Sequence, residues 1–250
     1  MIIIKSPADL QRMREASAIA ARVRDEVAQQ VRPGVTTGEL AEFAGELLRA
    51  LGAESAFLGY RGYPGWICVS VNEEVVHGIP GPRRIEAGDI VSLDVGVRYR
   101  GFVGDTATTV MAGVTDTEII RLVRATERAL WAGIEAARAG RRLSDVSHAI
   151  ESTATAAGYA VVRQFVGHGI GRQMHEDPQI PNFGPPGRGP VLKAGMTLAI
   201  EPMVNLGRQE VEVLEDGWTV VAQDRRPSAH FEHTVAVTAG DPEVLTLRGG

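Results

Sequence analysis

Four stretches of the chain carry apolar residues at the three- and four-residue spacing that is typical of amphipathic helices. The first follows Ser6-Pro7, an N-cap residue and a proline suited to the first helical turn, and is predicted over residues 7–31. The other three are predicted over residues 36–51, 117–139 and 144–157, and a glycine follows each of them. The helices therefore come in two pairs, separated by a long stretch of another kind.

The segments outside the helix pairs have the alternating pattern of strands. Strands are predicted near residues 67–71 and over 89–97 and 102–111, and the chain beyond Tyr159 also has the pattern of strands and loops. Alternation over 89–97 places Asp94 on the face opposite to the valines and the leucine of the same strand. A carboxylate is therefore expected on one side of an otherwise apolar strand.

The order of two helices followed by strands occurs twice. Arg32-Pro33-Gly34 is matched by Arg138-Ala139-Gly140 at an offset of 106 residues, and Ala87-Gly88 is matched by Ala194-Gly195 at an offset of 107. We therefore predict an α+β fold built from a duplicated unit of two helices and an antiparallel sheet, related by pseudo-twofold symmetry. No linker rich in proline or serine separates the halves, so a single domain over residues 1–250 is expected.

The composition is that of an ordinary soluble globular protein, with 44% hydrophobic and 23% charged residues. The net charge of −5 offers no basic field for nucleic acid. Cys68 is the single cysteine, which excludes an intrachain disulfide. The opening residues lack the apolar region of a signal peptide, and no apolar run is long enough to span a membrane. We expect a cytoplasmic protein with no specific nucleic-acid partner.

Four carboxylates stand in apolar, strand-like surroundings, at Asp94, Asp105, Glu201 and Glu232. Carboxylates are rarely buried unless a charge or a metal compensates them. Partner arginines such as Arg98 or Arg163 would be one explanation. The alternative is a metal site, because several carboxylates with a histidine form an oxygen-rich ligand set suited to two divalent cations.

The histidine for such a site is offered by the segment Gly-His-Gly-Ile-Gly-Arg-Gln-Met-His-Glu-Asp-Pro at residues 167–178. His168 lies between glycines, which permit close backbone approaches and disfavour a helix, so a strand end or loop is predicted there. His175 follows seven positions later. A solvated loop with two incidental histidines is the alternative, and the four carboxylates weigh against it.

These motifs together resemble the type I methionine aminopeptidases. The resemblance is carried by His-Gly-Ile-Pro at His77, the spacing of Asp94 and Asp105, the 167–178 segment, Glu201-Pro202 and Glu232-His233-Thr234. It covers essentially the whole chain and implies the pita-bread fold, a duplicated α+β unit. The short distance from His175 to Glu201 and the lack of an N-terminal zinc-binding extension are similar to the bacterial enzymes.

The resemblance implies a dinuclear metal site whose ligands are Asp94, Asp105, His168, Glu201 and Glu232. Asp105 and Glu232 would bridge two cations (Co, Mn, Fe, Ni or Zn), His168 and Glu201 would bind one of them, and Asp94 would chelate the other. It also implies a monovalent cation near Asn72 and Ser228.

Three residues receive catalytic roles from the same resemblance. Glu201 would carry protons, His175 would donate a hydrogen bond to the scissile carbonyl oxygen, and His77 would interact with the leaving amide nitrogen. The two cations would lower the pKa of a shared water so that it attacks the first peptide bond. The expected activity is removal of the initiator methionine when the second residue is small.

A compact apolar pocket should receive the methionine side chain. Family positions indicate Tyr60, Tyr63, Cys68, Met174 and Trp218 as its walls, although each could instead be core. Three residues depart from the family pattern: Met174 replaces a frequent aromatic, Phe57 stands where some relatives have cysteine, and His230 replaces a common glutamine.

Two other classes of protein share the fold. Prolidases and X-Pro aminopeptidases have similar ligands but usually carry a large N-terminal domain, for which this chain has no room. Non-catalytic pita-bread proteins generally lack metal ligands, whereas all five positions are filled here. The expected partners are therefore nascent polypeptide N-termini. We expect the protein to be a monomer that associates transiently with the ribosome and not with a membrane.

Overall fold

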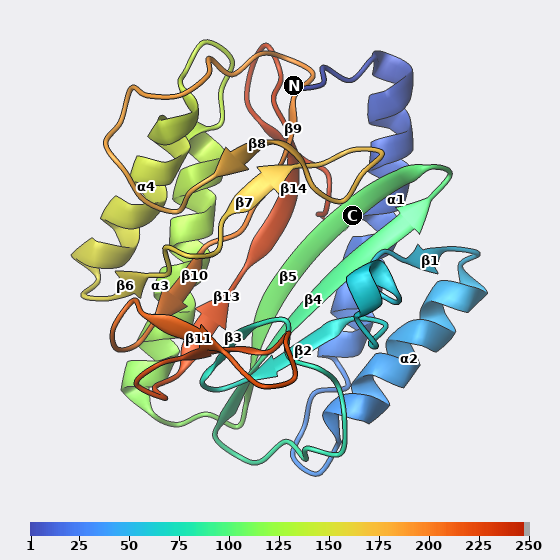
Figure 1. Cartoon of the computed structure of the whole chain (residues 1–250), viewed down its shortest axis with the longest axis vertical. Helices are drawn as coiled ribbons and strands as arrows, with labels where there is room; N and C mark the ends of the chain where they lie inside the picture. The colour runs from blue at the N-terminus through green and yellow to red at the C-terminus, as the bar shows by residue number, and fades with distance from the viewer. Residues whose placement is uncertain (248–250) are drawn as a thin grey trace.

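The helices form where the sequence pattern predicts them. The computed structural model describes residues 1–247. Within them the long helices are α1 (Pro7–Ala28), α2 (Thr37–Ala50), α3 (Thr117–Ala136) and α4 (Leu143–Ala156) (Figure 1). The order of two helix pairs separated by strands is therefore confirmed.

Helix starts are predicted more closely than helix ends. At the start of α1 the Ser6 hydroxyl accepts a hydrogen bond from the Asp9 amide while the Asp9 carboxylate accepts one from the Ser6 amide. Every helix ends one to three residues before its predicted end. For α1 the reason is Val31, which packs against the same core from the turn after the helix. Apolar spacing thus continues past the last helical residue.

In the part of the chain that the structure describes, antiparallel pairing builds one large sheet and two small ones. The large sheet has the strand order β1-β4-β5-β14-β9-β7-β8, with β2 paired to β4 and β15 paired to β14. Its strands are β1 (Glu54–Ser55), β2 (Cys68–Val71), β4 (Asp89–Tyr99), β5 (Phe102–Ala112), β7 (Gly167–Gly169), β8 (Glu176–Ile180), β9 (Thr197–Ile200), β14 (Glu232–Ala236) and β15 (Glu243–Val244). The first small sheet joins β13 (Ser228–His230), β10 (Met203–Asn205) and β6 (Ala160–Val161), and the second joins β11 (Val211–Val213), β12 (Val220–Ala222) and β3 (Glu74–Val76).

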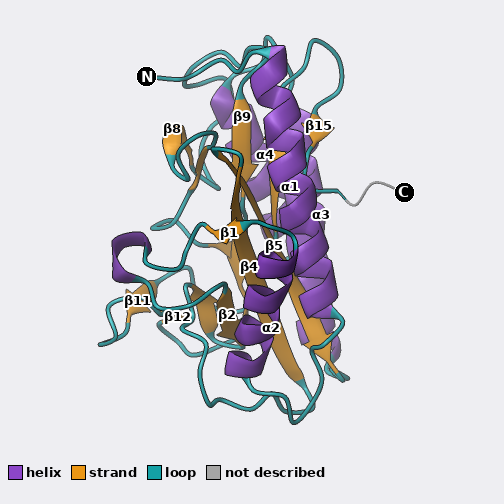
Figure 2. Ribbon diagram, turned by 90° about the vertical axis from the view of Figure 1, so that its right-hand side faces the viewer, coloured by secondary structure: helices purple, strands orange, loops and turns teal. Residues whose placement is uncertain are grey.

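The four long helices lie on one side of the large sheet, and β11 and β12 lie on the other (Figure 2). The small sheet of β13, β10 and β6 packs against α3 and α4. Residues of α1 and α2 pack on β4 through Val91, Leu93 and Val95, as the alternation of that strand predicts. Residues of α3 and α4 form a second apolar cluster with β9 and β14. The two largest apolar clusters therefore lie between helices and strands, and a smaller one is formed mainly by β3, β10, β11 and β12. Asp94 lies on the face of β4 opposite to Leu93 and Val95.

The duplicated unit predicted from the sequence is confirmed by matching backbone contacts. Thr36 forms an isolated bridge with Arg84, and Arg142 forms the equivalent bridge with Val191. The amide of Gly34 donates to Ile85, and the amide of Gly140 donates to Leu192. These pairs are related by the same offsets of 106 and 107 residues. The halves join where β5 pairs with β14.

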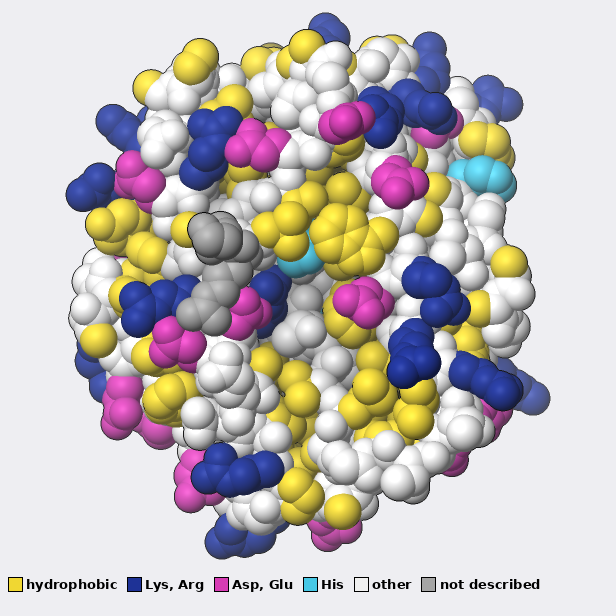
Figure 3. All heavy atoms as spheres, turned by 180° about the vertical axis from the view of Figure 1, so that it is seen from behind, with side chains coloured by type: hydrophobic (Ala, Val, Ile, Leu, Met, Phe, Trp, Pro, Cys, Tyr) yellow, Lys and Arg dark blue, Asp and Glu magenta, His cyan; other side chains and the backbone are white. Residues whose placement is uncertain are grey.

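The helix-covered face carries both signs of charge in a mixed pattern, without a field of one sign (Figure 3). Among the described residues, the helices are all too short or too polar to cross a membrane.

Candidate metal centre

Adjacent strands of the large sheet bring the predicted metal ligands together. In sheet order, β4 carries Asp94, β5 carries Asp105, β14 carries Glu232, the residue directly after β9 is Glu201, and β7 carries His168. Four strands and the residue after a fifth thus supply one side chain each, although these residues span much of the sequence. The pairing of the two halves creates the cluster.

Strand register explains why these side chains share a face. Asp94 and Glu232 both lie opposite Ala107, from the two strands that flank β5. Asp105 is two residues before Ala107, so it is on the same face of β5. Asp94 and Asp105 come alongside each other because β4 and β5 pair as adjacent antiparallel strands.

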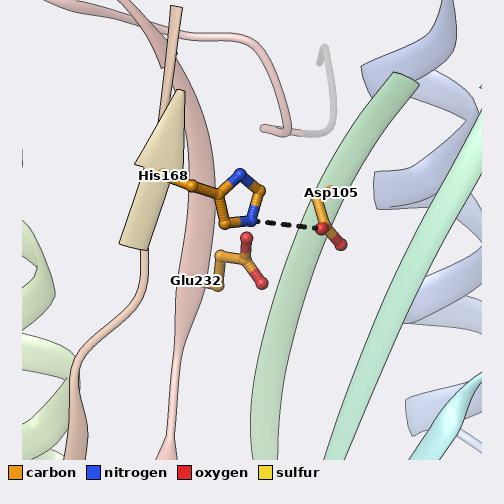
Figure 4. Close-up of side chains that lie close together, drawn as sticks. All are labelled: Asp105, His168 and Glu232. Atoms are coloured by element: carbon orange, nitrogen blue, oxygen red, sulfur yellow. Dashed lines mark ion pairs between the residues drawn. The ribbon is translucent and has the colours of Figure 1, made fainter. Parts of the chain in front are cut away.

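The cluster is tight and buried. Asp105, His168 and Glu232 point toward one another (Figure 4), and each offers a ligand atom within 4.8 Å of those of the other two. The His168 Nε2 atom lies 3.4 Å from the Glu201 Oε1 atom and 4.0 Å from the Asp105 Oδ2 atom. Exposure of the side chains of Asp105, His168 and Glu201 is 5%, 8% and 14%.

Partner arginines do not explain these buried acids. Arg98 donates to the backbone carbonyl of Arg172, and Arg163 pairs with Glu151 at 3.1 Å. The interpretation of Arg98 or Arg163 as partners of the carboxylates is therefore wrong, because both guanidinium groups are used elsewhere.

The electrostatics of the cluster fit a bound cation. Burial, followed by the neighbouring carboxylates, raises the pKa of Asp94, Glu201 and Glu232, and burial raises the pKa of Asp105 to about 7. Buried oxygens of Asp94, Asp105 and Glu232 have no hydrogen-bond partner within the described residues. Uncompensated buried carboxylates are costly, and divalent cations remove that cost by direct ligation.

His168 is held in the form that binds metals. Burial lowers its pKa to about 3, which keeps the imidazole neutral. Its Nδ1 atom is 2.9 Å from the Gly169 carbonyl oxygen, so Nδ1–H donates there and the Nε2 lone pair faces the carboxylates. Gly169 is required for close approach, since a Cβ atom there would lie 2.0 Å from the Asp177 carbonyl oxygen. The predicted strand-end geometry is confirmed.

A cavity of about 320 Å³ opens onto the cluster. Its lining includes all five carboxylate and histidine ligands predicted from the sequence, together with His77, His175, Tyr60, Tyr63, Cys68 and Trp218. Met174 is not in that lining. It is 2% exposed and packs with Phe57 against Gly96, while its neighbour His175 faces the cavity. The structure thus places Met174 in the core next to the site.

Aromatic side chains form much of the wall. The ring centroids of Tyr63 and Trp218 are 5.1 Å apart, and the Tyr63 hydroxyl donates to the Gly78 carbonyl at 2.8 Å. Cys68 lies opposite Asp94 on the adjacent strand, and burial raises the pKa of its thiol. Lining residues that the sequence did not single out as pocket walls are Phe57, Arg61, Val76, Phe165, Val166 and Met203. Most are apolar and look like ordinary core in a sequence.

The two remaining histidines of the cavity lie at different depths. His175 is exposed; its Nδ1 atom is 3.0 Å from the Tyr60 hydroxyl, and its ring centroid is 4.3 Å from that of His168. His175 thus lies in the loop before β8, outside the apolar clusters. His77 is half-buried and adopts a φ of 61°, with its ring 5.7 Å from that of Phe165.

Three further residues were singled out from the sequence: His230, Asn72 and Ser228. His230 is 1% exposed and its Nε2 atom has no hydrogen-bond partner among the described residues, but it does not line the cavity. The Ser228 amide donates to the Asn72 carbonyl at 2.8 Å. The Asn72 side chain donates to Asp89.

Comparisons with known proteins agree with this geometry. The profile of metallopeptidase family M24 matches residues 11–239. Methionine aminopeptidase 1 of Bacillus subtilis is 48% identical over 246 residues, which is 98% of this chain and 99% of that protein. A methionine aminopeptidase of Clostridium perfringens is 49% identical, with 99% of both chains covered.

Solved structures show the same fold. A methionine aminopeptidase from Thermotoga maritima superposes with a TM-score of 0.97 at 48% identity, covering 98% of this chain and 99% of the other. A prolidase from Pyrococcus furiosus reaches a TM-score of 0.81 at 23% identity and is covered over 66% of its length. The prolidase likeness extends to the fold alone.

Proposed function

The chain belongs to metallopeptidase family M24, and we propose that it acts as a bacterial-type methionine aminopeptidase. It removes the N-terminal methionine of polypeptides whose second residue is small. The observation that carries the proposal is the buried cluster of Asp105, His168 and Glu232 beside a cavity lined by aromatic side chains, in a chain 48% identical to a methionine aminopeptidase over nearly its full length.

We propose that Asp94, Asp105, His168, Glu201 and Glu232 hold two divalent cations drawn from Co, Mn, Fe, Ni and Zn. The oxygen-rich donor set and the buried carboxylate oxygens without partners support this assignment. When bound, such cations supply Lewis acidity that activates water and polarises the scissile carbonyl. A monovalent cation near the adjoining backbones of Asn72 and Ser228 is proposed as well.

The side chains around the cluster would orient the substrate and move its protons. The Tyr60 hydroxyl lies 3.0 Å from the Nδ1 atom of His175, and a hydrogen bond donated by that hydroxyl would leave the ring proton on Nε2, where it could bond to the carbonyl oxygen. His77 would contact the leaving amide nitrogen, and Glu201 would carry a proton to that nitrogen. Met174 would support the methionine pocket from the core, and Tyr60, Tyr63, Cys68 and Trp218 would form its walls.

Replacing His175 with alanine should lower kcat by about 10²–10³, the usual cost of removing one donor to a developing oxyanion. The free energy of unfolding should barely change, because the side chain is exposed. Steady-state kinetics with Met-Ala-Ser and thermal denaturation measure the two quantities. A variant that unfolds readily but keeps wild-type kcat per folded molecule would make His175 structural.

The proposed function is tested by assaying the metal-loaded enzyme with Met-Ala-Ser and with an Xaa-Pro dipeptide. Release of free methionine from the first, with little cleavage of the second, is expected. Faster cleavage of the Xaa-Pro bond would instead favour a prolidase. Elemental analysis in the same experiment separates both enzymes from a non-catalytic protein, which would bind no divalent metal.

We also propose the cellular setting. A single catalytic domain over residues 1–250 would meet nascent N-termini in the cytoplasm as a monomer that associates transiently with the ribosome. The concave site supports the choice of an exposed, unfolded chain end as the substrate, because a cavity of about 320 Å³ can receive one side chain and the adjoining backbone. Neither a membrane nor a specific nucleic acid is proposed as a partner.

A further inference from the structure

The residue that follows His175 in the chain, Glu176, belongs to a buried ion pair with Lys5. The Lys5 Nζ atom is 2.6 Å from the Glu176 Oε2 atom, and the two side chains are 4% and 5% exposed. Buried charges of this kind are rare, and breaking such a pair leaves an uncompensated charge in the interior. Glu176 follows His175 in the chain and is the first residue of β8. The pair therefore anchors the residue next to His175.

Hydrogen bonds connect this ion pair to the loop before β8 and to the segment before β9. The Glu176 Oε1 atom accepts a hydrogen bond from the Gln173 amide at 3.2 Å, which closes the turn that precedes His175. At the other end of the pair, the Lys5 amide donates to the Gly195 carbonyl at 2.8 Å. The loop is thus joined through Lys5 to the segment that leads into β9.

Gly171 leaves the space that the pair occupies. A Cβ atom at this position would lie 2.5 Å from the Glu176 Oε1 atom and 2.6 Å from the Lys5 Cε atom. The Gly171 amide donates to the Gln173 carbonyl, and its own carbonyl accepts from the Val103 amide. The loop from Gly171 to His175 is therefore folded around the ion pair.

The side chain of His175 is exposed, and within residues 1–247 its neighbours are two rings: Tyr60, whose hydroxyl is in hydrogen-bond contact with it, and His168. The placement of the His175 ring against these two neighbours depends on the loop backbone that carries it. We propose that Lys5 is a positioning residue for catalysis, which acts through Glu176 to hold His175 at the cavity. The inference rests on the proposed function, in which His175 contacts the substrate.

The test is a double-mutant cycle of Lys5→Met with His175→Ala on the full-length, metal-loaded enzyme. Lys5→Met keeps an unbranched side chain and removes the charge. A displaced catalytic group typically costs one to two orders of magnitude, so kcat for Met-Ala-Ser should fall about 10- to 100-fold with KM changed less than about threefold. In the His175→Ala background the same substitution should change kcat less than about twofold, since the group that it positions is absent.

Two matched variants separate positioning from general damage. Gly171→Ala leaves all charges in place but displaces the pair, so its kcat should fall in the same way as that of Lys5→Met. Leu48→Ala removes apolar packing from α2, distant in sequence from the loop, and should lower stability without lowering kcat per folded molecule. If Lys5→Met does not fold, Glu176→Gln, which keeps the shape of the side chain, replaces it in the cycle.

Several results would overturn the proposal. Wild-type kcat in folded Lys5→Met is one, and an equal fall in kcat with and without His175 is another. Failure of both Lys5→Met and Glu176→Gln to fold would assign the pair to stability instead of positioning. Because these results are all measured against a wild-type enzyme that cleaves Met-Ala-Ser, they are distinguishable from failure of the proposed function, in which the wild type itself is inactive.

Discussion

The Glu201→Ala variant is expected to remain folded and to lose at least about 10³-fold in kcat, because the substitution removes a proposed metal ligand and the proposed proton carrier together. Glu201 lies 3.4 Å from His168, and its pKa is raised by burial and by Asp105 and Asp94. Its removal relieves repulsion among buried carboxylates in the metal-free protein. Stability of that form should therefore not fall.

The measurements are kcat with Met-Ala-Ser, bound metal by elemental analysis, and the midpoint of thermal unfolding of the apoprotein. Glu215→Ala is the matched control, since Glu215 is exposed and outside the cavity lining, and it should behave as wild type. Retention of more than a tenth of wild-type kcat by Glu201→Ala, with its metal content intact, would contradict the dinuclear mechanism.

The second large effect is expected in the choice of the first residue. Met-Ala-Ser should be cleaved at least about 10³-fold more efficiently than Lys-Ala-Ser, because an ammonium group would be desolvated against the apolar walls without a partner. Tyr63, Cys68 and Trp218 supply these walls, and burial raises the pKa of the Cys68 thiol, which leaves it neutral. The comparison is made as kcat/KM at equal peptide concentrations.

Smaller changes of the substrate measure how closely the same pocket fits the methionine side chain. Norleucine in place of methionine should lose about 1–3 kcal/mol of transition-state binding, and leucine should be poorer because it branches one carbon too early. Met-Leu-Ser tests the second residue, which must pass His77 and the nearby Phe165 ring, and should be cleaved slowly. Leu-Ala-Ser and Lys-Ala-Ser cleaved as fast as Met-Ala-Ser would indicate a broad aminopeptidase and a wrong pocket assignment.

The local elements and the duplicated unit can be predicted from the sequence alone. Helix starts such as Ser6-Pro7 are set by hydrogen bonds and backbone preferences of adjacent residues, so they can be predicted without knowledge of the fold. The repeat can be recognised in the sequence because the two halves have equivalent turn glycines, Gly34 and Gly140, which are related by the 106-residue offset. The candidate ligands were recognisable because a carboxylate such as Asp94 is out of place in an apolar strand.

The way in which distant segments of the chain meet could not be predicted, because it depends on tertiary contacts. The pairing of β14 with both β5 and β9 joins residues more than a hundred positions apart in the first case, and no local pattern specifies it. For that reason the sequence left Arg98 and Arg163 open as partners of the buried acids, and the structure directs them elsewhere.

The same reason accounts for the pocket walls and the ion pair of Lys5 and Glu176. Met174 and Phe165 are both apolar residues beside the site, and only packing places the first in the core and the second in the cavity wall. Lys5 and Glu176 are 171 positions apart and look like ordinary surface charges in the sequence. They are buried as a pair because the fold closes the N-terminal segment over the loop, and burial depends on neighbours that local sequence does not contain.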